Sequence, residues 1–217
     1  MASQWVGGDG GARNWLGSLF LLLAGLIVLL GARTRRGAAA LALVALAGFA
    51  AEVIGVRTGF PFGRYAYTGA LQPQLFGVPL VMSLAWMALV AYAADLAGRL
   101  RLPAWPAAFA AALWTTAADL VIDPLATVHF KYWTWAHQGV YYGIPFTNFA
   151  GWFVTALVAC RILGPRPQTN FWASLVGASI LLFFALVALA NSLLPVALTG
   201  FALCAAGIFI AAKLRPN

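Results

Sequence analysis

The sequence predicts an all-α integral membrane protein, with about seven transmembrane helices in a single transmembrane domain that covers residues 1–217. Hydrophobic side chains make up 63% of the chain and charged ones only 8%, whereas soluble domains carry about 25% charged residues. Apolar runs of about 20 residues, the length that crosses a hydrocarbon core, recur along the chain. They lack the alternation of a membrane β-barrel, and only helices then satisfy the backbone in lipid.

The apolar runs give the expected helices in order. They cover residues 15–31, 37–56, 76–97, 104–123, 146–163, 171–191 and 195–212. The first run is interpreted as a membrane helix and not as a cleaved signal, because its strongest basic cluster, residues 33–36, follows the apolar stretch. Cys160 and Cys204 fall inside expected spans and are interpreted as small buried apolar residues.

Positive charges between the spans indicate the topology. Nine would lie on one side of the membrane: Arg33, Arg35, Arg36, Arg99, Arg101, Arg161, Arg166, Lys213 and Arg215. Four would lie on the other: Arg13, Arg57, Arg64 and Lys131. By the positive-inside rule, we expect a multi-pass protein of the cell membrane with its N-terminus outside and its C-terminus cytoplasmic. The net charge of +8 then reflects topology, so membrane lipid is an expected partner and nucleic acid is not.

Two long connections, residues 57–75 and 124–145, are rich in aromatic residues and resemble each other. The first carries Tyr65 and Tyr67, then Gly77-Val78-Pro79, then Trp86; the second carries Trp133 and Trp135, then Gly143-Ile144-Pro145, then Trp152. We interpret them as parts of an internal repeat, approximately residues 37–97 and 104–163, whose copies share one orientation because each contains two spans. The repeat predicts a pseudo-symmetric four-helix core with both loops on the non-cytoplasmic side. The alternative is that two loops at a membrane interface merely look alike.

Three acidic residues lie near the outer ends of expected spans. Glu52 is in the second span, and Asp119 and Asp123 lie four residues apart in the fourth, hence on one helix face. A carboxylate in a membrane helix costs about 2.5–3.5 kcal/mol on insertion scales, so such residues are functional-site candidates. The repeat would bring all three to one cavity. Desolvation and mutual repulsion disfavour full ionisation, so we expect at least one carboxyl to stay protonated near neutral pH, as general acid/base chemistry requires.

A simpler interpretation is that these acids pair with Arg57, Arg64 or Lys131 and only fix the loops. The remaining polar residues also have ordinary explanations. Asp9 lies in the N-terminal tail, and Asp95 precedes Arg99 by four residues, as in a surface or helix-end ion pair.

His129 and His137 are eight residues apart and form no known metal-binding motif, so no metal is expected. The chain also has no phosphate-binding glycine motif, so nucleotide chemistry has no support.

Aromatic side chains cluster beside the acids. Aromatic belts at membrane interfaces are common, but rings can also line a channel for a polyene and attract a developing cation through their faces. The candidate substrate-binding residues are Tyr65, Tyr67, Trp86, Trp133, Trp135, Tyr141, Tyr142, Asn148 and Trp152. Asn148 can orient a water molecule, although hydrogen bonding between helices is its commoner role.

The ordered set Glu52, TGFPFGRYAY, LFGVP, DLVIDP and YWTWAHQGVYYGIPFTNFAGW resembles the membrane-bound carotenoid hydratase family, over roughly residues 50–153. The resemblance implies a hydro-lyase that needs no cofactor, a carotenoid 1,2-hydratase of carotenoid biosynthesis. It would add water across the terminal double bond of an acyclic carotenoid end group and give a tertiary alcohol. Substrates of the family include lycopene, γ-carotene and bacterioruberin precursors.

This reaction agrees with the chemistry of the residues. Protonation of a trisubstituted alkene gives a tertiary cation that water captures, so an acid, a base and a water suffice. We expect Glu52, Asp119 and Asp123 to be catalytic, with Asp119 or Asp123 favoured as the acid and Glu52 assisting.

A carotenoid would reach such a site from the lipid. An oligomer, or a complex with other carotenoid enzymes, is compatible with the sequence. The rival hypotheses are a membrane carotenoid cyclase or isomerase, in which a double bond captures the cation, and a non-catalytic isoprenoid-binding protein or transporter.

Overall fold

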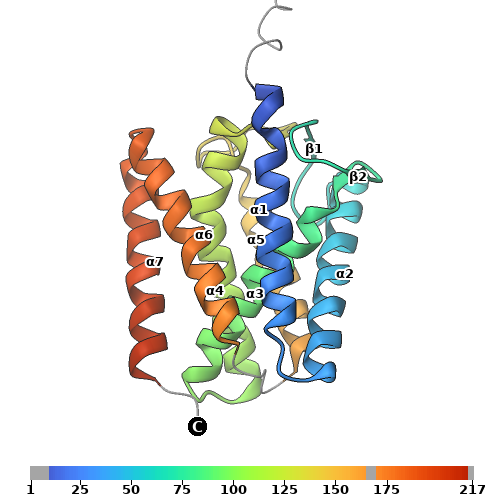
Figure 1. The fold of residues 1–217 in the computed structure, drawn as a ribbon. Coiled ribbons are helices and arrows are strands. Elements are labelled where there is room, and N and C mark those ends of the chain that lie inside the picture. Colours follow the sequence, from blue (N-terminus) through green and yellow to red (C-terminus); the bar gives the residue numbers. More distant parts are fainter. Residues whose placement is uncertain (1–9, 165–169, 215–217) are drawn as a thin grey trace, which may run out of the picture.

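The computed structural model describes residues 10–164 and 170–214, with side chains from residue 15 onward. Seven α-helices form one bundle, and the strands and long loops gather at one end of it (Figure 1). The helices are α1 (Gly10–Leu30), α2 (Arg35–Thr58), α3 (Val81–Arg99), α4 (Ala104–Pro124), α5 (Phe146–Leu163), α6 (Phe171–Ala190) and α7 (Leu194–Lys213). The prediction of an all-α membrane protein is therefore confirmed.

Six helices, α2 to α7, are long and apolar enough to cross a membrane. Helix α1 is also apolar, but the part of it with described side chains, Trp15–Leu30, is shorter. The third expected span began too early, because residues 76–80 form a turn and a short strand before α3 starts at Val81. The fourth ended too early, because α4 continues into a π-helical turn, η1 (Leu125–His129).

Helix α3 is the central helix and packs against α1, α2, α4 and α6. Two glycines on neighbouring helices allow this close packing. A Cβ on Gly48 of α2 would lie 2.5 Å from Cβ of Trp86, and a Cβ on Gly177 of α6 would overlap the ring of Tyr92. Small residues at helix contacts let membrane helices approach closely, so α3 can bury large aromatic side chains in the middle of the bundle.

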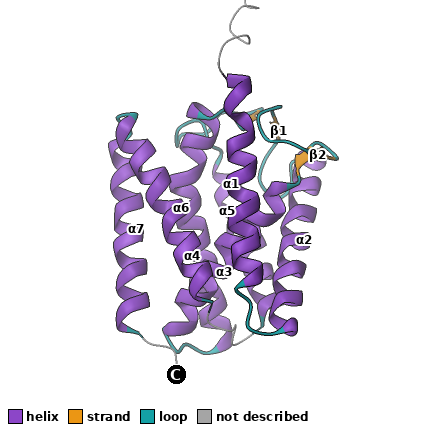
Figure 2. Ribbon diagram, viewed as in Figure 1, coloured by secondary structure: helices purple, strands orange, loops and turns teal. Residues whose placement is uncertain are grey.

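A short antiparallel sheet, which the sequence did not predict, joins the two aromatic loops. Strand β1 (Tyr65–Tyr67) pairs with β4 (Trp133–Trp135), and Ala66 lies opposite Thr134 at the centre. A second pair, β2 (Gln74–Leu75) with β3 (Val78–Pro79), forms a hairpin within the first loop. All these strands lie at the loop end of the bundle, where β1 and β2 are labelled in Figure 2. The sheet fixes each aromatic loop against the other.

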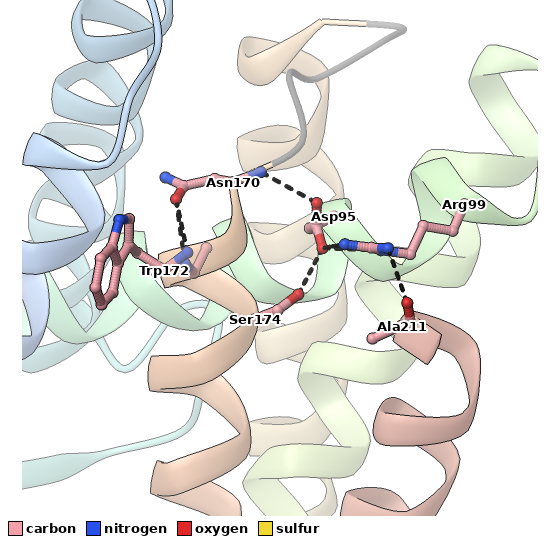
Figure 3. Close-up of polar contacts among 7 residues, drawn as sticks. Asp95, Arg99, Asn170, Trp172, Ser174 and Ala211 are labelled. Atoms are coloured by element: carbon pink, nitrogen blue, oxygen red, sulfur yellow. Dashed lines mark hydrogen bonds and ion pairs between the residues drawn. The ribbon is translucent and has the colours of Figure 1, made fainter. Parts of the chain in front are cut away.

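A polar cluster joins α3, α6 and α7 at the opposite end of α3 (Figure 3). Asp95 Oδ2 accepts hydrogen bonds from Nε and Nη2 of Arg99, at 3.1 and 2.9 Å, and from the hydroxyl of Ser174. Asp95 Oδ1 accepts from the backbone N–H of Asn170, and Arg99 Nη1 donates to the carbonyl of Ala211. The predicted pair of Asp95 with Arg99 does form, but Asp95 is only 3% exposed, so it is a buried contact between helices and not a surface pair.

Candidate functional site

Three carboxyl groups are buried near the loop end of the bundle. Glu52 is on α2 and is 4% exposed, while Asp119 and Asp123 are on α4 and are 0% and 1% exposed. The two aspartates are one helical turn apart, so both project from the same face of α4. Taking such groups out of water is costly unless hydrogen bonds replace the lost hydration. Their partners therefore indicate how the site is built.

Glu52 accepts hydrogen bonds on both of its oxygens. The hydroxyls of Tyr65 and Tyr67, on β1, donate to Oε2, the latter at 2.8 Å. The indole N–H of Trp86, on α3, donates to Oε1 at 2.8 Å. Burial, together with the nearby Glu52 carboxyl, raises the pKa of both tyrosines above the ordinary value of 10.0, so both stay protonated as donors at neutral pH.

The two aspartates share one amide group. Nδ2 of Asn148, on α5, donates to Oδ2 of Asp119 at 2.8 Å and to Oδ2 of Asp123 at 2.7 Å. The indole N–H of Trp133, on β4, donates to Oδ1 of Asp123 at 2.9 Å. Oδ1 of Asp119 is buried and has no hydrogen-bond partner. The pair therefore has fewer donors than Glu52, and a single side chain holds its two members together.

No cation compensates these three carboxyls within the described part of the chain. The buried ion pair of Arg99 with Asp95 lies at the other end of α3. Arg57 lies over the ring of Phe76 instead, 5.1 Å from its centroid. The simpler interpretation, in which Arg57, Arg64 or Lys131 pairs with the acids to fix the loops, is therefore not what the structure shows.

A small cavity lies beside Glu52. Its lining residues are Glu52, Phe62, Tyr65, Tyr67, Met82, Trp133, Trp135, Asn148 and Trp152. The cavity volume is about 20 Å³, enough for one water molecule. The indole N–H of Trp135 is buried without a partner, so it can donate to such a water. Neither aspartate lines the cavity, because they lie behind Asn148 and Trp133, which do.

The other aromatic candidates lie outside this cavity. Trp86 stacks on Trp152, with ring centroids 4.3 Å apart, so it supports the wall from behind. The Tyr141 hydroxyl donates to the carbonyl of Leu120 on α4, and Tyr142 packs edge-on against Tyr141.

Two lining residues, Phe62 and Met82, were not predicted from the sequence. Phe62 lies in the quoted TGFPFGRYAY segment, so its place in that aromatic stretch could have identified it. Nothing in the sequence around Met82 distinguishes it from other apolar residues of a membrane helix.

No group of three or more His, Cys, Asp or Glu side chains in the described residues is placed to hold a metal ion. What the site contains is a set of buried carboxyls, neutral hydrogen-bond donors and aromatic rings around a cavity of water size. Carboxyls can exchange protons with a substrate, and rings can stabilise a cation. The arrangement therefore suits acid-catalysed chemistry on an apolar molecule.

Comparison with known proteins agrees with this description. The family model described as "Carotenoid biosynthesis protein" matches residues 14–211. The bisanhydrobacterioruberin hydratase of Haloarcula japonica is 35% identical over 144 residues, which are 64% of this chain and 47% of that protein. The chain thus spans about half the length of this curated relative. No solved structure matches.

Proposed function

Because this chain belongs to the carotenoid biosynthesis protein family, we propose that it is a carotenoid hydratase, which adds water to the terminal double bond of an acyclic carotenoid end group. The observation that carries the proposal is the site itself: three buried carboxyls without a compensating cation, beside an aromatic cavity large enough for one water. A relative named as a hydratase supports the same reaction.

The proposed reaction needs only a proton and a water. A protonated carboxyl gives its proton to the less substituted carbon of the double bond, whose π electrons form the new C–H bond. The resulting tertiary cation is captured by a lone pair of water, and the oxonium returns one proton to the carboxylate. The protein ends with the protons it began with, so the net change is the addition of one water and no cofactor takes part.

We propose Asp119 and Asp123 as the acid, in line with their hydrogen bonding. Two like charges this close to one amide do not both ionise easily, so the pair tends to keep a proton. Trp133 and Asn148 separate the pair from the cavity. In this proposal the entering end group displaces the side chains of Trp133 and Asn148. The double bond can then reach the carboxyl groups of the aspartates.

The internal repeat is part of the same proposal. The two aromatic loops pair around Ala66 and Thr134, with the two strands antiparallel. Trp86 and Trp152, which occupy equivalent repeat positions, stack on each other. These contacts support two related halves, approximately residues 37–97 and 104–163, that meet at the site. We also propose that the loop end faces the non-cytoplasmic side, on the charge distribution described above.

The test is to express the chain in bacterial hosts that accumulate lycopene or bisanhydrobacterioruberin and to measure pigment masses. A gain of one water for each hydrated end is expected with the unchanged chain. Asp119→Asn, Asp123→Asn and Glu52→Gln are expected to abolish the gain while inserting normally. Thr199→Ala, a half-buried position on α7 away from the site, is the matched control and should keep full activity.

Each alternative gives a different result. A product of unchanged mass but altered chromatographic mobility indicates a cyclase or isomerase. Full turnover in all three acid variants would refute the carboxyl mechanism, even if hydration itself is observed. Binding without any product, with both pigments, would favour the non-catalytic binding protein.

A further inference from the structure

Glu52 is the one carboxyl that faces the cavity, and the walls around it are mainly aromatic. Six of the lining side chains are rings: Phe62, Tyr65, Tyr67, Trp133, Trp135 and Trp152. The face of each ring carries partial negative charge, which attracts a cation placed above it. A carboxyl and ring faces together make a surface that favours binding of a hydrocarbon group that carries a positive charge.

The hydrogen bonds rank the three carboxyls as sites for a negative charge. Glu52 has three donors, from Tyr65, Tyr67 and Trp86, and both of its oxygens are occupied. Asp123 has two donors, and Asp119 has one and leaves Oδ1 bare. Hydrogen bonds from fixed donors stabilise a carboxylate. If the cluster holds a single negative charge, Glu52 is therefore where that charge is most stable.

The groups that face Glu52 come from three elements, and none is a cation. Tyr65 and Tyr67 on β1 and Trp86 on α3 are neutral donors, while the aspartates on α4 are the nearby ionisable groups. A charge on Glu52 thus has no counter-ion among the described residues. In a site of low polarity such a charge acts strongly on whatever enters the cavity.

We propose that Glu52 is a permanent anion that transfers no proton, and that the cavity it faces, enlarged when Trp133 and Asn148 are displaced, is a binding site for a positively charged isoprenoid end group. The natural guest is the tertiary cation of the reaction; a tertiary ammonium of the same shape is its stable equivalent. The proton that starts the reaction belongs to the Asp119–Asp123 pair. This inference rests on the proposed function for the identity of the cation, but the binding site itself can be tested without turnover.

The donors to Glu52 explain how such an anion would accelerate the reaction. Their hydrogen bonds fix the carboxylate in place before the substrate arrives, so no reorganisation is needed when positive charge develops. The Glu52 carboxylate stabilises the cation more than it stabilises the neutral alkene. Only this difference lowers the barrier, because interactions equal in both states do not raise the rate.

The experiment compares two probes bound to the full chain in nanodiscs of zwitterionic lipid. One is a short isoprenoid ending in a protonated dimethylamino group, and the other is its neutral isopropyl-ended isostere. Quenching of tryptophan fluorescence reports binding, and empty nanodiscs correct for partition into lipid. We expect the unchanged protein to prefer the ammonium probe by about tenfold or more. Equal affinities would overturn the proposal.

Two variants then test which carboxyl carries the negative charge that attracts the ammonium probe. Glu52→Gln should abolish the preference by weakening the ammonium probe alone, whereas Asp119→Asn should keep it. A preference that survives Glu52→Gln, or that Asp119→Asn removes, would contradict the assignment to Glu52. Should Glu52→Gln fail to fold, Glu52→Asp replaces it, because it withdraws the anion from the cavity by one methylene. That variant must weaken the ammonium probe more than the neutral one, and equal changes count against the proposal.

This test separates the two proposals. If the ammonium preference depends on Glu52 but no carotenoid gains water, the cation site stands and the hydratase function is wrong. If carotenoids are hydrated but Glu52→Gln leaves the preference unchanged, the function stands and the role of Glu52 as a fixed anion is refuted.

Discussion

Replacing Asp95 by asparagine should loosen the attachment of α6 and α7 to α3. The side chains of Asp95 and Arg99 are 1% and 9% exposed, and their closest atoms are 2.9 Å apart. Removing one partner of a buried pair typically costs about 3–5 kcal/mol, because the other charge stays buried and unpaired. Arg99 keeps its bond to the Ala211 carbonyl and lies in the last turn of its helix, where a cation is favoured. The low end, about 3 kcal/mol, is therefore expected.

For a chain of this size, about 3 kcal/mol corresponds to a fall in Tm of about 6–12 °C. The assay is the temperature at which half of the detergent-solubilised protein is lost from its size-exclusion peak after heating. Thr199→Ala, whose hydroxyl bonds only within α7, is the control and should change the free energy of unfolding by less than about 0.5 kcal/mol. If Asp95→Asn lowers Tm no more than Thr199→Ala does, the cluster does not hold the helices together. A double variant with Arg99→Gln should lose less than the sum of the single changes.

Three further predictions concern other parts of the molecule. Asn148→Leu removes the amide that holds Asp119 and Asp123 together, so carotenoid turnover measured by product mass should fall by about tenfold to a hundredfold, or about 1.4–2.7 kcal/mol in the barrier; unchanged turnover would show that the amide is dispensable. Gly177→Val places side-chain atoms in the ring of Tyr92 and should cost about 1–3 kcal/mol in heating assays, whereas Gly98→Ala, with nothing within 4 Å, should cost nothing. Burial raises the pKa of Tyr141 from 10.0 to about 12, so its contribution to stability is complete below pH 10.0 and is lost as the pH rises through about 12. Tyrosinate absorbance should therefore show a step near pH 12 that is lost in Tyr141→Phe, and titration of this tyrosine near pH 10.0 would contradict the burial of its ring.

The helices could be predicted from the sequence because their cause is local. Each apolar run is itself long enough to span the bilayer, so hydropathy places it without knowledge of its neighbours. The errors occur where a local turn interrupts the apolar pattern. Val78 and Pro79 look like the start of a span, but Gly77 has a positive φ of 80° and the chain turns back to pair with β2 before α3 begins.

The contacts within the site depend on residues far apart in the sequence, and hydropathy carries no information about them. That Asp119 and Asp123 share a helix face follows from their spacing, but that Asn148 joins them requires the packing of α5 on α4. In the same way, Trp86 could be noticed as a repeat position, but its role as a donor to Glu52 depends on the contact of α3 with α2.

The pairing of β1 with β4 has a consequence for how the protein is made. Every donor to Glu52 lies before residue 87, and the donors to Asp119 and Asp123 follow these aspartates along the chain, so Glu52 and the aspartate pair take their donors from separate parts of the sequence. At about 5–20 residues per second, the ribosome needs roughly 4–14 seconds to make the roughly 70 residues between the two strands. During that interval all the donors to Glu52 are already made, so their hydrogen bonds to the buried carboxyl can form before β4 exists. Closing the sheet is then a late step of biogenesis, and a chain stopped before β4 would contain all three acids and every donor to Glu52, but would lack Trp133 and Asn148, the donors to the aspartates.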